Sequence, residues 1–263
     1  MGSLILTAIV FVVVFGGGVL GLQLQRALPE GSTTGAGRDA TGAVVGLVTL
    51  LLALVLGLLI WTAYGVFSTQ KGLIQTLAVS ALRFDQALQD YGPKGADGRR
   101  ILREGLKNTI AEIWGSVDDR EFEMKNYSYT IAYVKARATY LSTLEPESEQ
   151  EKAAKAEATQ AANAIGQTRM QMALSLADPI SYPLAGIVVA WAAFLFCGYG
   201  LLSKRNAMSY VVLAIGAMSI ASAIYIITDL ASPYSGLFQV SPAPIIDVLK
   251  AVDEALAPAG SHR

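Results

Sequence analysis

The sequence predicts an all-α integral membrane protein in which four transmembrane helices form two pairs, with a helical-bundle insert between the second and the third. Three observations lead to this fold class. Of the 263 residues, 53% are apolar and only 16% are charged, a balance that is typical of membrane proteins. Four segments are apolar over about twenty residues, the length that crosses a bilayer. A long polar stretch with helical spacing of its apolar residues separates the two pairs.

The four candidate spans contain no Asp, Glu, Lys or Arg, and they are Leu4–Leu22, Gly42–Phe67, Leu184–Leu202 and Ala207–Thr228. The first span has no basic segment before it and no evident cleavage site after it, so we interpret it as a retained helix rather than a signal peptide. Gly17 and Gly21 lie one helical turn apart, which predicts the close approach of another helix. We expect Gly57 of the second span to serve helix packing as well.

The polar insert, residues 68–178, is expected to fold as a bundle of helices. In the first helix, apolar residues alternate at spacings of four and three: Leu77, Ala81, Phe84, Leu88 and Tyr91. The stretch YGPKGADG ends this helix. Similar patterns predict a second helix over 102–117 and a third over 127–141. A fourth helix is predicted from Glu147 to Leu176, because Pro146 and several acidic residues stand at its start.

The predicted organisation follows from these segments. Membrane helices occupy 1–67 and 179–229, the insert lies between them, and a tail follows at 230–263. The tail begins with several prolines and is expected to be irregular there. Its later part, Ile245–Leu256, is predicted to be an amphipathic helix with one apolar side, formed by Ile246, Leu249 and Val252.

The ionisable residues offer little for catalysis. The only cysteine, Cys197, stands in an apolar run, and the only histidine, His262, stands at the end of the chain. An acidic cluster fits a solvated helix start better than an EF-hand loop, and it comprises Asp118, Asp119, Glu121 and Glu123. The basic stretch DGRRILREGLK fits a solvated helix face. We therefore predict no enzymatic activity, no cofactor, no metal site and, with a net charge of -1, no nucleic-acid partner.

Motifs in the second span and after the last one carry a family resemblance. Leu56-Gly57-Leu58 and Ala63-Tyr64-x-x-Phe67 have the spacing of a second-span pattern of bacterial bestrophins. The stretch DLASPYSG is similar to the acidic and Pro-Phe-Gly stretch that follows the last span of bestrophins. Together with RALPEGSTTGAGRDATGAVVGLV and DLASPYSGLFQVSPAPIIDVL, these motifs resemble a bestrophin-like family of bacterial membrane proteins, distantly similar to bestrophin ion channels, over nearly the whole chain.

The resemblance implies a homo-oligomer, expected to be a pentamer, that passes small inorganic ions across the lipid bilayer. The second helix of each subunit would line an apolar neck, at positions Leu50, Leu54 and Leu58. The pore mouth would be formed by Thr49, Thr62 and Tyr64. Where the family has Arg and Asn after its Leu-Gly pair, this chain has Leu59 and Trp61. The ionic selectivity of the family is therefore not expected to carry over.

Two other functions remain open from the sequence. One is a non-conducting membrane sensor or scaffold whose insert binds a partner. The other is a transporter, which the absence of ionisable residues within the spans disfavours. An even number of spans places both termini and the insert on one side of the membrane. Lys and Arg are balanced between the two sides, and the resemblance favours a cytoplasmic insert on a multi-pass protein of the inner (plasma) membrane.

Overall fold

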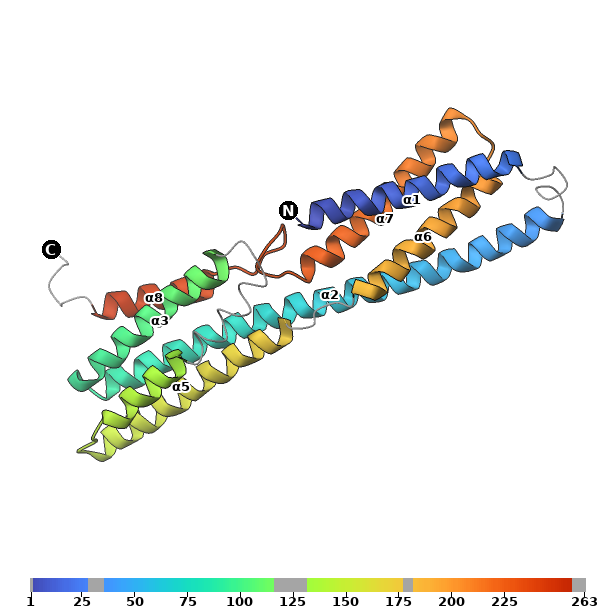
Figure 1. The fold of residues 1–263 in the computed structure, drawn as a ribbon. Coiled ribbons are helices and arrows are strands. Elements are labelled where there is room, and N and C mark those ends of the chain that lie inside the picture. The colour runs from blue at the N-terminus through green and yellow to red at the C-terminus, as the bar shows by residue number, and fades with distance from the viewer. Residues whose placement is uncertain (1, 28–35, 116–131, 177–181, 257–263) are drawn as a thin grey trace. The chain divides into compact units, whose positions relative to one another are not determined.

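A computed structural model describes residues 2–27, 36–115, 132–176 and 182–256, and these residues contain helices and no strand. The chain divides into two compact units (Figure 1). The first comprises Met1–Gly65 and Ile180–Ala231, and the second comprises Val66–Pro179 and Ser232–Arg263. The tail thus belongs to the same unit as the polar insert. Each unit is described by itself below.

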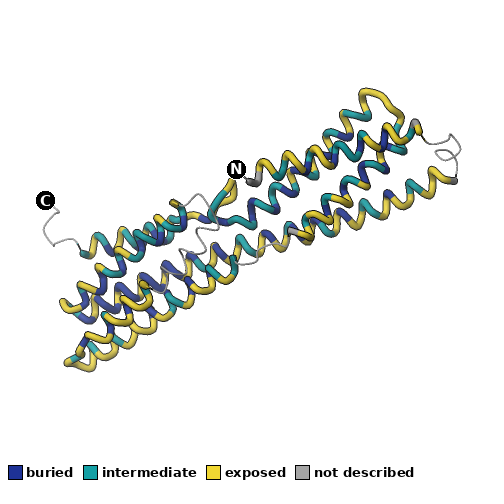
Figure 2. Tube along the Cα trace, in the orientation of Figure 1, coloured by how far each residue is buried: buried dark blue, intermediate teal, exposed yellow. Residues whose placement is uncertain are grey.

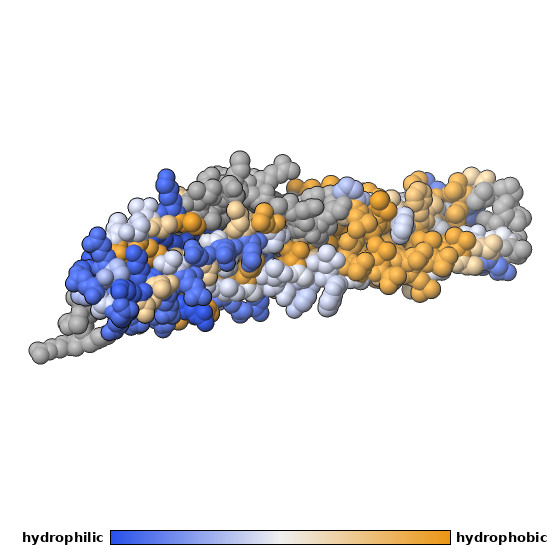
Figure 3. Space-filling model, turned by 90° about the horizontal axis from the view of Figure 1, so that it is seen from below, coloured by the Kyte–Doolittle hydropathy of each residue, from blue (hydrophilic) through white to orange (hydrophobic). Residues whose placement is uncertain are grey.

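The first unit contains the apolar helices. They are α1 (Gly2–Ala27), the part of α2 (Ala36–Asp90) up to Gly65, α6 (Tyr182–Leu202) and α7 (Ala207–Leu230). All four helices are long and apolar enough to cross a membrane. On the face shown in Figure 3, apolar residues (orange) dominate this unit, whereas hydrophilic residues (blue) dominate the second unit. The predicted all-α membrane fold with four candidate spans is confirmed.

Glycines on α1 allow its backbone to lie against α6. A Cβ atom at Gly17 would lie 2.5 Å from the carbonyl oxygen of Ala193, and one at Gly21 would lie 2.1 Å from that of Cys197. From the first contact to the second, the residue number rises by four on α1 and by four on α6, so the two helices run parallel. Such distances are impossible for real side chains, and only glycine permits this approach. Cys197 is half-buried at this contact.

Helix α2 continues through the boundary between the two units without a break and is 55 residues long. From the sequence, a span ending at Phe67 and a separate insert helix were expected in this stretch. The physical reason for the continuity is composition, because no proline stands between Pro29 and Pro93. The helix ends before Gly92, which adopts a left-handed conformation with φ 92°. Pro93 then starts a 3-10 turn, η2 (Pro93–Gly95).

The second unit is a helical bundle around one apolar core. It contains the rest of α2, then α3 (Ala96–Gly115), a helical segment at 132–143, α5 (Glu149–Leu176) and α8 (Ala243–Leu256). The stripe predicted on the first insert helix is buried in full (dark blue in Figure 2): Leu77, Ala81, Phe84, Leu88 and Tyr91. The end of the second predicted insert helix (102–117) and the start of the third (127–141) fall within 116–131, outside the described residues.

The start of α5 differs slightly from the expected position at Glu147. The helix begins at Glu149, and Ser148 caps it by accepting a hydrogen bond from the backbone N–H of Glu151 at 3.1 Å. The carboxylate of Glu151 in turn accepts the backbone N–H of Glu147 at 2.6 Å. This reciprocal arrangement resembles a capping box, and it moves the helix start two residues beyond the proline-based prediction.

The basic stretch at the start of α3 is not uniformly solvated, contrary to the sequence analysis. Arg99 is buried, and its Nε donates to Oδ1 of Asp85 at 2.7 Å while its Nη2 donates to Oδ2 at 3.2 Å. Arg100, by contrast, is exposed and pairs with Asp97. Arg99 is therefore buried because it pairs with a buried carboxylate on α2. Helical spacing on α3 alone does not reveal this pairing.

Helix α8 packs its apolar face onto α3. The buried residues are Ile245, Val248 and Val252. Of the predicted apolar side, Val252 is buried, Leu249 is half-buried and packs against the core, and Ile246 is only half-buried. Trp114 of α3 donates its indole N–H to the carbonyl oxygen of Val240 at 2.8 Å, and Arg103 pairs with Asp253. These contacts turn the buried face by about one residue from the face that hydrophobic spacing favours.

Candidate functional site: the exposed face of α2

The membrane part of α2 has one face buried within the unit. Its buried residues recur at helical spacing: Val45, Leu52, Leu56, Leu59 and Ala63. Helix α6 supplies part of this packing, because a Cβ atom at Gly198 would lie 2.5 Å from a methyl carbon of Val45. Because this stripe faces the interior of the unit, the opposite side of α2 faces outward.

The opposite face is apolar and exposed. Leu50, Leu54 and Leu58 are 71%, 70% and 64% exposed in the single chain. The stripe extends in both directions beyond the three predicted leucines, to Leu47 and Trp61, which are also exposed. Continuing the 3.6-residue period by one turn at each end would have found both residues. The three leucines named from sequence thus lie in the middle of a longer exposed stripe.

The three polar residues assigned to the pore mouth lie in different surroundings. The Thr49 hydroxyl donates to the carbonyl oxygen of Val45 at 2.7 Å and lies 2.9 Å from the hydroxyl of Tyr199 on α6. The Thr62 hydroxyl donates to the carbonyl oxygen of Leu58 at 2.9 Å and is exposed, as is Tyr64. Thr49 therefore lies beside α6, whereas Thr62 and Tyr64 lie on the open surface of the helix.

Gly57 differs from Gly17 and Gly21. A Cβ atom at Gly57 would meet no atom within 4 Å among the residues that the structure describes. Within the described part of the chain, no helix packs closely against Gly57, so its role in helix packing stays a prediction.

The exposed stripe of α2 has no group that could perform acid–base or nucleophilic chemistry. The side chains that form it, those of Leu47, Leu50, Leu54, Leu58 and Trp61, are hydrocarbon or aromatic. Among the described residues, no group of three or more His, Cys, Asp or Glu side chains could hold a metal ion. The acidic cluster at 118–123, considered in the sequence analysis, lies outside the described residues, as does His262. The stripe can pack, exclude water or restrict a passage.

A polar network in the second unit joins α2, α5 and the tail. Gln70 is fully buried, and its Nε2 donates to the carbonyl oxygen of Met172 at 3.1 Å and to Ser175 Oγ at 2.6 Å. The hydroxyl of Tyr234 donates to Gln70 Oε1 at 2.6 Å, and its ring meets Trp114 edge to face. Burial raises the pKa of Tyr234, so it stays a neutral donor. The Pro-Tyr-Ser-Gly stretch is thereby held against α2 in this bundle.

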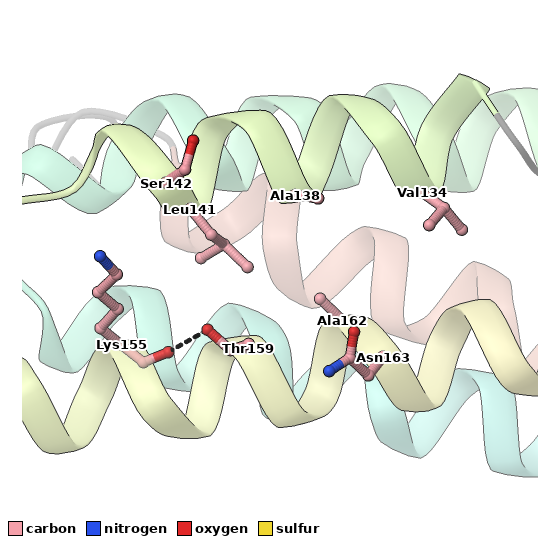
Figure 4. Close-up of a pocket in the computed structure, with 8 residues that line it drawn as sticks. All are labelled: Val134, Ala138, Leu141, Ser142, Lys155, Thr159, Ala162 and Asn163. Carbon is pink, nitrogen blue, oxygen red and sulfur yellow. Dashed lines mark hydrogen bonds between the residues drawn. The ribbon is translucent and has the colours of Figure 1, made fainter.

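A shallow pocket of about 260 Å³ lies between the segment 132–143 and α5 (Figure 4). Val134, Ala138 and Leu141 point from that segment toward α5. The amine of Lys155 donates to the carbonyl oxygen of Leu144 at 2.7 Å, so its charge is engaged at the rim. This pocket offers an apolar wall rather than a reactive group.

An apolar unit with four membrane-length helices and a polar helical unit together define an all-α integral membrane protein. A family model described as a bestrophin-like domain matches residues 12–245. The chain therefore belongs to the bestrophin-like family, as the motifs of the second span and the tail predicted. A comparison with curated protein sequences found no match.

Solved structures of similar fold support the same architecture. A bacterial bestrophin homologue from Klebsiella pneumoniae is 11% identical, with a TM-score of 0.65 over 95% of this chain and 98% of that chain. A second structure of this homologue is 10% identical, with a TM-score of 0.64 over 95% and 97% of the two chains. A crystal structure of a membrane protein is 10% identical, with a TM-score of 0.68 over 96% and 99%. At these identities the likeness concerns the fold.

Proposed function

We propose that the protein is an oligomeric ion channel in which the exposed stripe of α2 lines an apolar neck. The observation that supports this most directly is the exposure of Leu50, Leu54 and Leu58 on the side of α2 opposite its packed face. Membership of the bestrophin-like family and the likeness to bestrophin homologue structures point in the same direction. In this proposal the stripes of several subunits face a common axis.

The proposed assembly is a homopentamer in the inner (plasma) membrane. A ring of leucines at each level would form a constriction that small ions cross only when it is wetted, which is how apolar gates operate. Thr62 and Tyr64 would meet ions at one end of the neck, while Thr49 would contact both α6 and the passage. Gly57 would leave space at the level between Leu54 and Leu58. The permeating species would be small inorganic ions.

The polar unit would stand on the cytoplasmic side and surround a water-filled vestibule. Its hydrophilic surface is consistent with an aqueous location. The network of Gln70 and Tyr234 would hold the tail against this unit. Enzymatic activity has no part in the proposal, because the site offers no reactive group.

Reconstitution into liposomes tests conduction. The protein should carry a flux of small ions, and Leu54→Ala should raise that flux several-fold because it widens the neck. Val212→Ala is the matched control, since Val212 is an exposed apolar residue of the membrane helix α7. We expect this control to leave the flux at the level of the unsubstituted protein. No flux in any of the three proteins would reject conduction and favour a non-conducting sensor or scaffold.

A further inference from the structure

A small cavity within the second unit contains two buried arginines. It measures about 20 Å³ and lies among α2, α3, α5 and the segment 132–143. Arg137 and Arg169 both line it, and they are 6% and 5% exposed. The other lining residues are apolar side chains, Gly105, Thr109 and Tyr133, so no acidic residue of the described chain borders the cavity. Two arginine side chains therefore line one small cavity, and none of the described residues that line it is acidic.

Arg169 has its partners in the chain. Its Nη2 donates to Oε2 of Glu112 at 3.1 Å, and its Nη1 donates to the hydroxyl oxygen of Thr109. The Thr109 hydroxyl donates its own hydrogen bond to the carbonyl oxygen of Gly105 at 2.7 Å, so its oxygen can accept from the arginine. One buried charge is thus compensated by Glu112.

Among the residues that the structure describes, Arg137 has no such compensation. Its Nε and Nη2 are buried and have no hydrogen-bond partner among the described residues. Burial and the neighbouring charge of Arg169 lower the pKa of Arg137 to about 10, so the side chain stays charged at neutral pH. A buried cation without a counter-charge is strongly unfavourable. A bound anion would satisfy the buried guanidinium of Arg137 and neutralise its charge.

The glycines of α3 explain why the arginine is held in this position. A Cβ atom at Gly105 would lie 3.2 Å from the ring of Tyr133, and one at Gly98 would lie 2.2 Å from the ring of Tyr140. The two tyrosines therefore lie against these glycines, and Tyr140 also donates to the carbonyl oxygen of Lys94 at 2.7 Å. Arg137 stands between them on the same helix face, which directs its side chain toward α3.

We propose that this cavity binds a single monatomic anion of the halide class between Arg137 and Arg169. Nε and Nη2 form one edge of a guanidinium, and their N–H groups converge on a common acceptor. A cavity needs roughly 10–15 Å³ to hold one water molecule, so about 20 Å³ leaves room for a single monatomic occupant somewhat larger than water and is too small for phosphate. Water fits by size but brings no charge. The proposal goes beyond ion conduction and does not depend on it.

The thermal stability of the purified full-length protein in detergent tests this site. Sodium chloride is compared with sodium gluconate at equal ionic strength. Because an anion bound only by the folded state stabilises it, the Tm should rise by about 3–5 °C for each tenfold increase of chloride above its dissociation constant. Bromide should act like chloride. An equal Tm in chloride and gluconate would overturn the proposal.

Two variants separate the cavity from general salt effects. Arg137→Met removes the charge and keeps the length of the side chain, so the chloride dependence should disappear. Arg100→Met is the matched control on an exposed arginine and should keep the dependence. An equal chloride effect in both variants would overturn the proposal.

A direct measurement remains if Arg137→Met does not fold. Crystals of the unsubstituted protein grown in sodium bromide should show an anomalous peak between the guanidinium groups of Arg137 and Arg169. A map without that peak, or with a carboxylate of a neighbouring subunit in its place, would contradict halide binding.

Discussion

Gly21 illustrates at the residue scale how the membrane helices approach one another. A Cβ atom there would lie 2.1 Å from the carbonyl oxygen of Cys197, a backbone atom that no side-chain rotation can move. Gly21→Ala must therefore push α1 away from α6, and overpacking of this kind costs about 1–3 kcal/mol. We expect a lower Tm for this variant in detergent, measured by thermal unfolding.

The same helix provides the control for this substitution. A Cβ atom at Gly16 would meet no atom within 4 Å among the described residues, so Gly16→Ala should leave the Tm unchanged or raise it slightly. If both alanine variants unfolded at the same temperature, the close packing of α1 on α6 would not contribute to stability.

The buried charges show which residues sequence reasoning could not place. Lys and Arg usually mark a solvated face, and the spacing of Arg99, Arg137 and Arg169 along their helices does not distinguish them from exposed neighbours. Their burial depends on groups distant in sequence, such as Asp85 on α2 for Arg99 and Glu112 on α3 for Arg169. Partner choice across helices is a property of the tertiary structure, and one sequence carries little signal for it.

At the scale of the elements, α8 shows how a short amphipathic helix finds its place. Hydrophobic spacing predicted the helix and one of its buried residues, Val252, but the exact face depends on contacts with α3. Val252 is fully buried, whereas its neighbour Ala251 is exposed. The orientation of α8 is thus decided by the surface that receives it rather than by its own pattern.

A pair of serine substitutions tests the docking of α8. Val252→Ser removes a buried apolar side chain, which contributes about 1.5–3 kcal/mol, and places a hydroxyl in the core. Amide hydrogen exchange of α8 should become faster in this variant. Ala251→Ser makes a serine at an exposed position of the same helix and should leave the exchange rate unchanged. Equal protection in both variants would contradict the docking.

Much of the fold and less of the candidate site could be predicted from the whole sequence. Long apolar segments identified the four membrane helices, because a bilayer demands about twenty apolar residues in any context. The continuity of α2 was missed, since a change from apolar to polar composition looks like a boundary although the backbone has no reason to break there. The leucine stripe was found only through family spacing. Hydropathy does not separate a surface that faces lipid from one that faces an axis.

Whether the α2 stripe faces lipid or a central axis can be tested on the assembled molecule. Leu54 on α2 and Phe194 on α6 are 70% and 76% exposed in the single chain, so exposure alone does not distinguish them. Leu54→Cys and Phe194→Cys are made in a Cys197→Ser background, which removes the only native thiol. If the α2 stripes surround the ion pathway, a bulky methanethiosulfonate reagent should block flux through Leu54→Cys and leave Phe194→Cys unaffected. Block at Phe194→Cys without block at Leu54→Cys would place the pathway elsewhere, because a thiol that faces lipid is out of contact with permeating ions.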